Sequence, residues 1–416
     1  MTSPIIVMAI GTAAGVFALT AIAWELAARL QAGSGGKVVF AICLGMGVLT
    51  VAAKAAGLLV AEHNLSSLHR TSSIAPRSTV RIEWRADSSL TAPWKALPLR
   101  GGNEEQAHVV ALGRSLFSDP ILSRNGKISC ASCHDIAQGG DDGQRVSIGI
   151  ADQAGTRNAP SVLNAALLSR QFWDGRAASL EEQAHGPILN PIEMAMPDRA
   201  SVQRALSEDG QYPALFRQAF GDHVQPTLDL AATAIAAYER TLVRESRYDR
   251  FVRGDRFALN EREQRGMALF AGLGCRECHR DPAFSSAGQI APAGVFKPFP
   301  VFMDDPRLRK YRFRDDLGAA RPGASTGLWR APSLRNVART GPYFHNGSVA
   351  ELRDAIRIMM WAQLGRKEIL PGASDTGQSP LWNPAARRLQ FLRPDIIHDS
   401  DVDDIRLFLE SLSADP

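Results

Sequence analysis

The feature that most constrains this chain is a short pattern that occurs twice: two cysteines separated by two residues, with histidine directly after the second. Two thiols one helical turn apart can be joined to the two vinyl groups of one porphyrin, and the adjacent imidazole then reaches the iron. Half of a zinc site or a thioredoxin-like pair also contains two such cysteines, but neither requires that histidine. The two copies therefore predict two covalently bound haem c groups. Their residues are Cys130, Cys133 and His134 in the first copy and Cys275, Cys278 and His279 in the second.

Composition sets wider limits. A length of 416 residues allows a membrane anchor and two domains, and 45% hydrophobic residues can form real cores. The formal net charge of +4 gives no reason to expect a nucleic-acid partner. Four of the five cysteines belong to the two motifs, and Cys43 lies in an apolar run, so no disulfide is predicted.

The N-terminal region contains two long apolar runs. Residues 4–24 carry no charged side chain, and residues 38–60 contain a single lysine, so each run is long enough to cross a bilayer. Arg29 and Lys37 flank the short turn between them, which the positive-inside rule places in the cytoplasm. We therefore expect a transmembrane helical hairpin over residues 1–61, in the cytoplasmic (inner) membrane, with the catalytic domains in the periplasm. A single anchor followed by a buried helix is the alternative.

The rest of the chain predicts helices joined by loops, without a convincing strand. Residues 62–103 are rich in Ser, Arg, Ala, Pro and Gly and indicate a linker. Helical periodicity begins at Glu104 and stops at Asp119, which precedes a proline. It returns at residues 180–184, 202–206 and 228–242, whereas residues 139–160 and 281–327 indicate long loops.

Helix starts are also predicted in the second half. Asn260 with Glu263 forms one candidate capping box, and Ser348 with Glu351 forms another. A last amphipathic helix begins near Ser400. The predicted fold is mainly α, with two cytochrome c-like haem domains, at residues 104–250 and 251–416, after the hairpin and linker.

From about residue 104 onward, the chain resembles the bacterial dihaem cytochrome c peroxidase family, which also includes MauG-type enzymes. The resemblance covers both haem domains and leaves out the N-terminal apolar runs and part of the 281–327 loop. The matching strings are LGRSLF at 112–117, SCASCH at 129–134, RNAPSVLN at 157–164, FWDGR at 172–176, APSLRNV at 331–337 and GPYFHNGS at 341–348.

The resemblance implies different roles for the two haems. The first, with His134 as proximal ligand, would be the peroxidatic haem, and the second, with His279, the electron-transfer haem. Gln183 and Glu193 match the distal-pocket pair, and Trp173 matches the tryptophan between the haems. A carboxylate of raised pKa in an apolar pocket can take a proton from one peroxide oxygen and deliver it to the other.

Other matches concern metal ligands. Met359 matches the second axial ligand of the electron-transfer haem, a position that is tyrosine in MauG itself. Asn158, Thr340 and Pro342 match positions that hold Ca²⁺. Many members carry a histidine before the RNAP string that caps the peroxidatic iron, and here that place is Ile150. Isoleucine cannot ligate iron, so we expect the first haem to be open at rest.

These implications predict a cytochrome c peroxidase-like enzyme that reduces hydrogen peroxide. Its electron donor would be a small redox protein, such as a cytochrome c or a copper protein. One alternative is a MauG-like enzyme that oxidises residues of a partner protein, and another is a non-catalytic electron carrier or redox sensor. The sequence leaves the donor and the oligomeric state open, a homodimer included.

Overall fold

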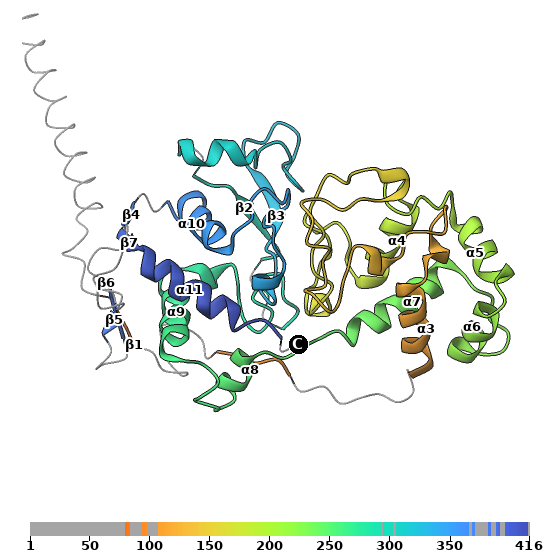
Figure 1. Ribbon diagram of the computed structural model, residues 1–416, viewed down its shortest axis with the longest axis horizontal. Helices are drawn as coiled ribbons and strands as arrows, with labels where there is room; N and C mark the ends of the chain where they lie inside the picture. The colour runs from red at the N-terminus through yellow and green to blue at the C-terminus, as the bar shows by residue number, and fades with distance from the viewer. Residues whose placement is uncertain are drawn as a thin grey trace, which may run out of the picture. The chain divides into compact units, whose positions relative to one another are not determined.

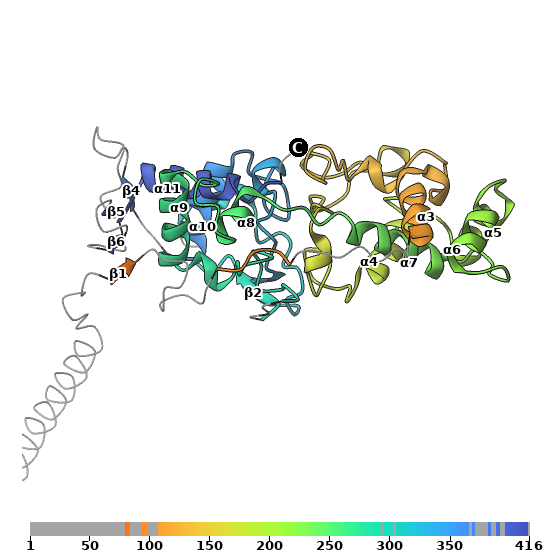
Figure 2. The ribbon, with the colours of Figure 1, turned by 90° about the horizontal axis from the view of Figure 1, so that it is seen from below.

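The structure of the protein is a computed structural model in which residues 79–416 form one compact unit. It describes residues 80–83, 94–98, 107–290, 292, 294–302, 305–365, 368–370, 382–383, 388–391 and 396–414. The helices of this unit gather in two groups, which we call the N-terminal lobe and the C-terminal lobe (Figures 1 and 2).

The N-terminal lobe holds α3 (Ala107–Ser118), α4 (Leu180–Leu189), α5 (Arg199–Glu208), α6 (Tyr212–Phe220) and α7 (Leu228–Arg240). The C-terminal lobe holds α9 (Glu261–Gly272), α10 (Leu352–Ala362) and α11 (Asp399–Glu410), and α8 (Arg247–Val252) lies between the two groups in sequence. Short 3-10 helices connect many of them. These are η2 (Pro120–Leu122), η3 (Cys130–Ser132), η4 (Ile150–Asp152), η5 (Ala165–Leu167), η6 (Cys275–Glu277), η7 (Pro306–Tyr311) and η8 (Val337–Arg339).

Each lobe is built on one close helix crossing that requires glycine. In the N-terminal lobe, a Cβ atom on Gly113 of α3 would lie 1.8 Å from the carbonyl oxygen of Ala234 in α7. In the C-terminal lobe, a Cβ atom on Gly266 of α9 would lie 1.9 Å from the carbonyl oxygen of Asp404 in α11. Because neither backbone can give way, only glycine allows the helices to approach this closely.

An aromatic pair closes each crossing. Phe117 of α3 meets Tyr238 of α7 with ring centroids 5.4 Å apart, and Phe270 of α9 meets Phe408 of α11 at the same 5.4 Å. Both pairs are edge-to-face or tilted, as the charge distribution of aromatic rings favours. The pairs belong to the two main hydrophobic cores, one in each lobe.

Strands are few and short in the described part of the chain. They form one sheet of order β1-β6-β5, an antiparallel pair β2-β3 and a parallel pair β4-β7. The sequence pattern predicts none of these, because runs of two to four residues carry no readable alternation. Their bounds are β1 Val80–Glu83, β2 Phe296–Phe299, β3 Gly327–Arg330, β4 Glu368–Leu370, β5 Trp382–Asn383, β6 Arg388–Phe391 and β7 Ile396–His398.

Of the two predicted capping boxes, the structure confirms one and contradicts the other. The capping box of Asn260 and Glu263 is confirmed, and α9 begins at Glu261. The box of Ser348 and Glu351 is wrong, because α10 begins at Leu352 with Glu351 as an N-cap that makes no side-chain hydrogen bond. Ser348 is held instead in a turn, where its backbone N–H donates to the side chain of Asn346 at 3.2 Å.

The predicted membrane anchor needs correction. No helix within the described residues is both long enough and apolar enough to cross a bilayer, which contradicts a multi-pass membrane protein. The runs at 4–24 and 38–60 on which the prediction rested lie outside the described residues. The mainly helical part of the fold prediction is confirmed, whereas the proposed domain boundaries stay predictions.

Candidate functional site

The first motif opens into a cavity of about 280 Å³ in the N-terminal lobe. Cys130, Cys133 and His134 line one part of it, and Gln183 of α4 and Glu193 line another. The fold therefore brings together two thiols, an imidazole and an amide–carboxyl pair from separate segments between Cys130 and Glu193. The thiols are unpaired, as attachment to a porphyrin requires.

His134 is oriented by its own loop. The turn η3 leads directly into it, and its Nδ1 lies 3.0 Å from the carbonyl oxygen of Gly140. Burial lowers the pKa of His134, so the ring is neutral at pH 7. An imidazole that donates from Nδ1 keeps a lone pair on Nε2, which is the form that binds a metal.

Glu193 is a half-buried carboxyl at the same cavity. Burial raises its pKa, while the positive charge of Arg176 and a hydrogen bond from Asn190 oppose that rise. The amide of Asn190 donates to Glu193 Oε1 at 2.7 Å, which fixes the carboxyl in place. A fixed carboxyl whose pKa is raised toward neutrality is suited to general acid–base work.

Ile150 stands at the position that the resemblance matches to a distal histidine. It is 3% exposed, and its backbone N–H is shared between the carbonyl oxygens of Ile192 and Glu193, at 3.0 and 2.9 Å. Its neighbour Gly149 lines the cavity, but Ile150 is not among the described residues that do. The backbone of Ile150 is therefore hydrogen-bonded to the Glu193 segment, and its side chain presents no ligand atom to the cavity.

Glu239 is a cavity residue that no sequence motif indicated. It lies on α7, is 4% exposed and lines the first cavity. Burial raises the pKa of its carboxyl to about 8. The available signal was helical periodicity, since Glu239 stands four residues after the buried Ile235 and so shares its inward face.

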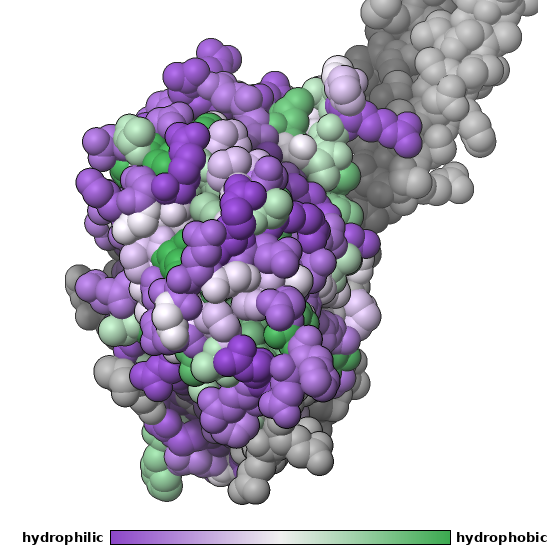
Figure 3. Space-filling model, turned by 90° about the vertical axis from the view of Figure 1, so that its right-hand side faces the viewer, coloured by the Kyte–Doolittle hydropathy of each residue, from purple (hydrophilic) through white to green (hydrophobic). Residues whose placement is uncertain are grey.

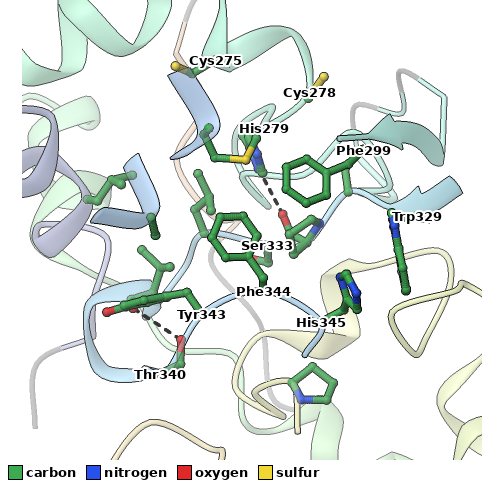
Figure 4. A pocket seen from close by; sticks show the side chains of 18 of the residues that line it. Cys275, Cys278, His279, Phe299, Trp329, Ser333, Thr340, Tyr343, Phe344 and His345 are labelled. Atoms are coloured by element: carbon green, nitrogen blue, oxygen red, sulfur yellow. Dashed lines mark hydrogen bonds between the residues drawn. The ribbon is translucent and has the colours of Figure 1, made fainter. Parts of the chain in front are cut away.

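The second motif lines a separate cavity of about 250 Å³ in the C-terminal lobe (Figure 4). His279 is buried, and its Nδ1 lies 3.1 Å from the carbonyl oxygen of Pro332. Burial lowers the pKa of His279 as well, so this ring is also neutral with Nε2 available. Cys275 and Cys278 lie on the same side of the cavity as His279, and neither forms a disulfide.

The far side of the second cavity is apolar and aromatic. Phe299 and Phe344 stack with centroids 5.3 Å apart, and both line the cavity (Figure 4). Met359 and Met360 of α10 line it too, although Met360 is buried in the main core and Met359 packs against the aromatic cluster. Thioether sulfur is thus available, and no acid–base pair like that of the first cavity lines this one within the described residues.

One wall is common to both cavities. Asn158, Pro160, Trp173 and Arg330 line both of them. Trp173 is fixed from two sides, because its Nε1 donates to the carbonyl oxygen of Asn158 at 2.9 Å and its own carbonyl accepts from the backbone N–H of Arg330 at 3.0 Å. The tryptophan singled out by resemblance therefore lies between the two cavities.

The three residues matched to calcium positions also lie near this wall. Asn158, Thr340 and Pro342 all line the second cavity. The amide nitrogen of Asn158 donates to the carbonyl oxygen of Gln144 at 2.9 Å, so its amide oxygen faces the other way. The described residues contain no group of three or more His, Cys, Asp or Glu side chains that could hold a metal ion.

The two cavities fit haem c by the chemistry of their donors. Each contains two cysteines outside any disulfide and one neutral imidazole whose Nδ1 lies within hydrogen-bond distance of a backbone carbonyl. Zinc held by both cysteine pairs would require them to converge in one site, whereas they line two different cavities. The donor sets therefore favour one porphyrin in each lobe.

The chain is similar to several known proteins. A family described as di-haem cytochrome c peroxidase matches residues 107–257. The cytochrome c551 peroxidase of Nitrosomonas europaea is 40% identical over 271 residues, which cover 65% of this chain and 78% of that protein. MauG of Paracoccus denitrificans is 37% identical over 370 residues, covering 77% and 94%. This chain belongs to the dihaem cytochrome c peroxidase and MauG family.

The fold agrees with this membership. A MauG-like protein associated with microbial copper homeostasis superposes with a TM-score of 0.60 at 28% identity, covering 80% of this chain and 96% of that one. The diheme peroxidase BthA from Burkholderia thailandensis gives 0.55 at 26% identity, covering 78% and 88%. As a member of this family, the chain is a peroxidase-type oxidoreductase with haem c as its cofactor. Each haem supplies a redox-active iron, and the residues that line each cavity set the polarity and the proton-transfer groups around it.

Proposed function

We propose that the protein reduces hydrogen peroxide to water at the His134 cavity, with electrons that enter through the His279 cavity from a small redox protein. The overall reaction consumes two electrons and two protons for each peroxide and yields two water molecules. Glu193 would take the proton from one peroxide oxygen and return it to the other, with Gln183 beside it as a hydrogen-bonding partner. The observation that carries this proposal is the asymmetry of the cavities, since among the described lining residues only the first has a carboxyl–amide pair.

Trp173 would connect the two sites. It lines both cavities, and its backbone and indole are both held by hydrogen bonds. Met359 would be the second axial ligand opposite His279, because thioether ligation raises a haem potential and suits an electron-transfer site. Asn158, Thr340 and Pro342 would hold Ca²⁺, as the resemblance implies. Metal analysis of the purified protein before and after dialysis against a chelator tests that part.

The test of the main proposal is steady-state turnover of peroxide with a reduced small cytochrome. We expect turnover that depends on both substrates, with water as the only product of peroxide. The second candidate is MauG-like oxidation of a partner protein. Two observations favour it: Ile150 stands where the resemblance expects a histidine, and the matched region covers 94% of the length of MauG. Mass spectrometry of candidate partners after exposure to peroxide distinguishes the two. Efficient modification of a partner without cytochrome turnover would support the second candidate and contradict the first.

Ile150 adds a proposal about the resting state. Because it offers no ligand and its loop is fastened to the Glu193 segment, the His134 haem should have no protein ligand on its peroxide side. The oxidised protein should therefore show a high-spin ferric signal in electron paramagnetic resonance and react with peroxide without prior reduction. Ile150→His should convert that signal to low spin and slow the reaction. Two low-spin haems in the unaltered protein would contradict this proposal.

The donor would dock on the basic surface of the C-terminal lobe. Val301 and Phe302 are 42% and 51% exposed, and both donate backbone N–H groups to the carbonyl oxygen of Ala362, at the end of the helix that carries Met359. Arg309 and Arg314 follow them in the sequence, are exposed and form no ion pair with any described residue. A positive surface with an apolar centre fits an acidic redox protein.

Charge reversal tests the docking surface. Arg309→Glu together with Arg314→Glu should raise KM for an acidic donor and weaken its dependence on salt, while kcat with a small-molecule reductant stays unchanged. Arg204→Glu is the matched control. It changes the charge on α5, on a face of the N-terminal lobe that is mostly hydrophilic, with apolar residues only scattered over it (Figure 3). An equal effect of the control would rule out docking at this surface.

A further inference from the structure

Arg330 is a buried cation in the wall between the two cavities. It is the last residue of β3, paired with Phe296 of β2, and it is 3% exposed. It lines both the His134 cavity and the His279 cavity. A guanidinium is always charged in proteins, so this position places a full positive charge between the sites.

The hydrogen bonds of Arg330 neutralise none of that charge. Its Nε donates to the carbonyl oxygen of Phe172 at 2.8 Å, and one terminal nitrogen lies 3.4 Å from the carbonyl oxygen of Ala331. No carboxylate among the described residues forms an ion pair with it. Burial lowers the pKa of Arg330 to about 10, and Asp174 opposes that change only from a distance.

The other arginines that line the cavities are different. Arg157, Arg176 and Arg335 all have carboxylate partners in direct contact. Those partners are Asp174 and Asp316 for Arg157, Asp174 for Arg176 and Asp249 for Arg335, at distances from 2.6 to 2.9 Å. Of these four arginines, only Arg330 lines both cavities, and only Arg330 has no ion pair with a described carboxylate.

A buried charge without a counter-charge is strongly unfavourable, so an anion should complete this site. A haem c carries two propionate carboxylates, and a planar guanidinium can hydrogen-bond to more than one carboxylate through its separate N–H groups. We infer that Arg330 is a shared propionate-binding residue that pairs with one propionate from each haem. The inference rests on the binding of two haems, which family membership implies, and not on the reaction with peroxide.

The shared pairing has an electrostatic consequence. A positive charge beside both haems disfavours the more positive, oxidised state of each iron and so raises both midpoint potentials. It also keeps both propionates ionised at neutral pH. Arg330 is therefore a positioning residue, which acts on the irons through the propionates and does not touch the peroxide.

Spectroelectrochemical titration of both haems, carried out without peroxide, tests this role. In Arg330→Gln, both potentials should fall, so that the ratio of reduced to oxidised haem at a fixed applied potential drops about tenfold, equivalent to 59 mV for a one-electron couple. Both potentials should also gain a pH dependence near neutrality, because the propionates can now be protonated. Arg330→Lys keeps the charge and should retain most of both potentials. Arg204→Gln, which removes an exposed charge on α5, is the control and should leave both unchanged.

Three results would overturn the inference. These are unchanged potentials in Arg330→Gln, a response of only one haem, or a fall in Arg330→Lys as large as in Arg330→Gln. If the Gln variant does not fold, resonance Raman spectra of Arg330→Lys against the unaltered protein decide the matter. The propionate bending bands of both haems should shift, and unshifted bands would contradict the pairing. Since no peroxide is used, a failure of the peroxidase proposal would leave these results intact.

Discussion

The two haem lobes share a framework and differ in what they place opposite the histidine. Both crossings have glycine against a backbone carbonyl, at Gly113 and Gly266, and both are closed by an aromatic pair. Asn164 and Asn336 start equivalent 3-10 turns with the same φ of 62°. The repetition indicates that the framework holds a porphyrin and does not by itself decide the chemistry.

The differences lie in the loops and the helix that face each histidine. Phe172 and Phe344 adopt similar positive φ angles of 66° and 70°, but the next residue is Trp173 in one lobe and His345 in the other. These two rings lie 6.5 Å apart. Glu193 makes the first cavity suitable for proton transfer, whereas the aromatic and thioether lining makes the second suitable for electron transfer. The proposed division of roles therefore rests on side chains placed around one repeated scaffold.

The largest expected effect comes from the carboxyl that distinguishes the first cavity. Glu193→Gln should slow the reaction with peroxide by roughly 10²–10⁴-fold, the usual contribution of a general acid–base group. Stopped-flow mixing with peroxide measures it. Glu208→Gln, on the exposed part of α5, is the control. A loss below tenfold would mean that the two cavities do not differ in the way described here.

The shared framework predicts the next largest effect, equally in both lobes. Gly113→Ala and Gly266→Ala should each lower the free energy of unfolding by about 3 kcal/mol, because the new methyl group meets a backbone carbonyl that cannot move aside. Chemical denaturation followed by circular dichroism measures it. Gly210→Ala, where a Cβ would meet no atom within 4 Å, is the control. If only one lobe responds, the crossings are not equivalent.

Exchange of the thioether should affect the second lobe alone. Met359→Ala should lower the potential of the His279 haem by on the order of 0.1 V, since the axial ligand is a main determinant of haem potential. Met360→Ala, at the neighbouring position about 100° around the helix, should leave that potential unchanged. The reverse result would assign the ligand to Met360, and a response of the His134 haem would contradict the separation of roles.

The smallest effect concerns Glu239, which has no counterpart in the second cavity. Its folded-state pKa of about 8 lies above the ordinary value of 4.5, so the carboxyl is protonated in the folded protein and ionised after unfolding between these pH values. Unfolding then releases a proton, and stability falls as pH rises through that window. Glu239→Gln cannot ionise and should be more stable by roughly 1–2 kcal/mol at pH 8, with little change near pH 4.5.

Thermal unfolding at both pH values measures this difference. Glu208→Gln again serves as the control, because its side chain is exposed. A stabilisation that is equal at both pH values would show that the gain does not come from ionisation. A loss of stability at pH 8 would show that the carboxyl is paired in the folded protein.

The sequence by itself determined the haem attachment motifs, the family and most helices. These features depend on residues close together in the chain, where spacing and periodicity translate directly into geometry. The capping box of Asn260 is one example, because both of its hydrogen bonds join residues three apart. The predicted capping box of Ser348 does not form, because the backbone N–H of Ser348 is hydrogen-bonded to the side chain of Asn346 in a turn. The spacing of Ser348 and Glu351 alone could not reveal this competing turn.

Only the tertiary structure decided which residues share a wall and which buried charges have partners. Glu239 and Arg330 carry no motif, and their burial is set by helices and strands from distant parts of the chain. Arg157 and Arg330 look alike in sequence, yet one meets Asp174 and Asp316 and the other meets only carbonyl groups. Long-range packing determines the surroundings of a charge, and those surroundings determine its chemistry.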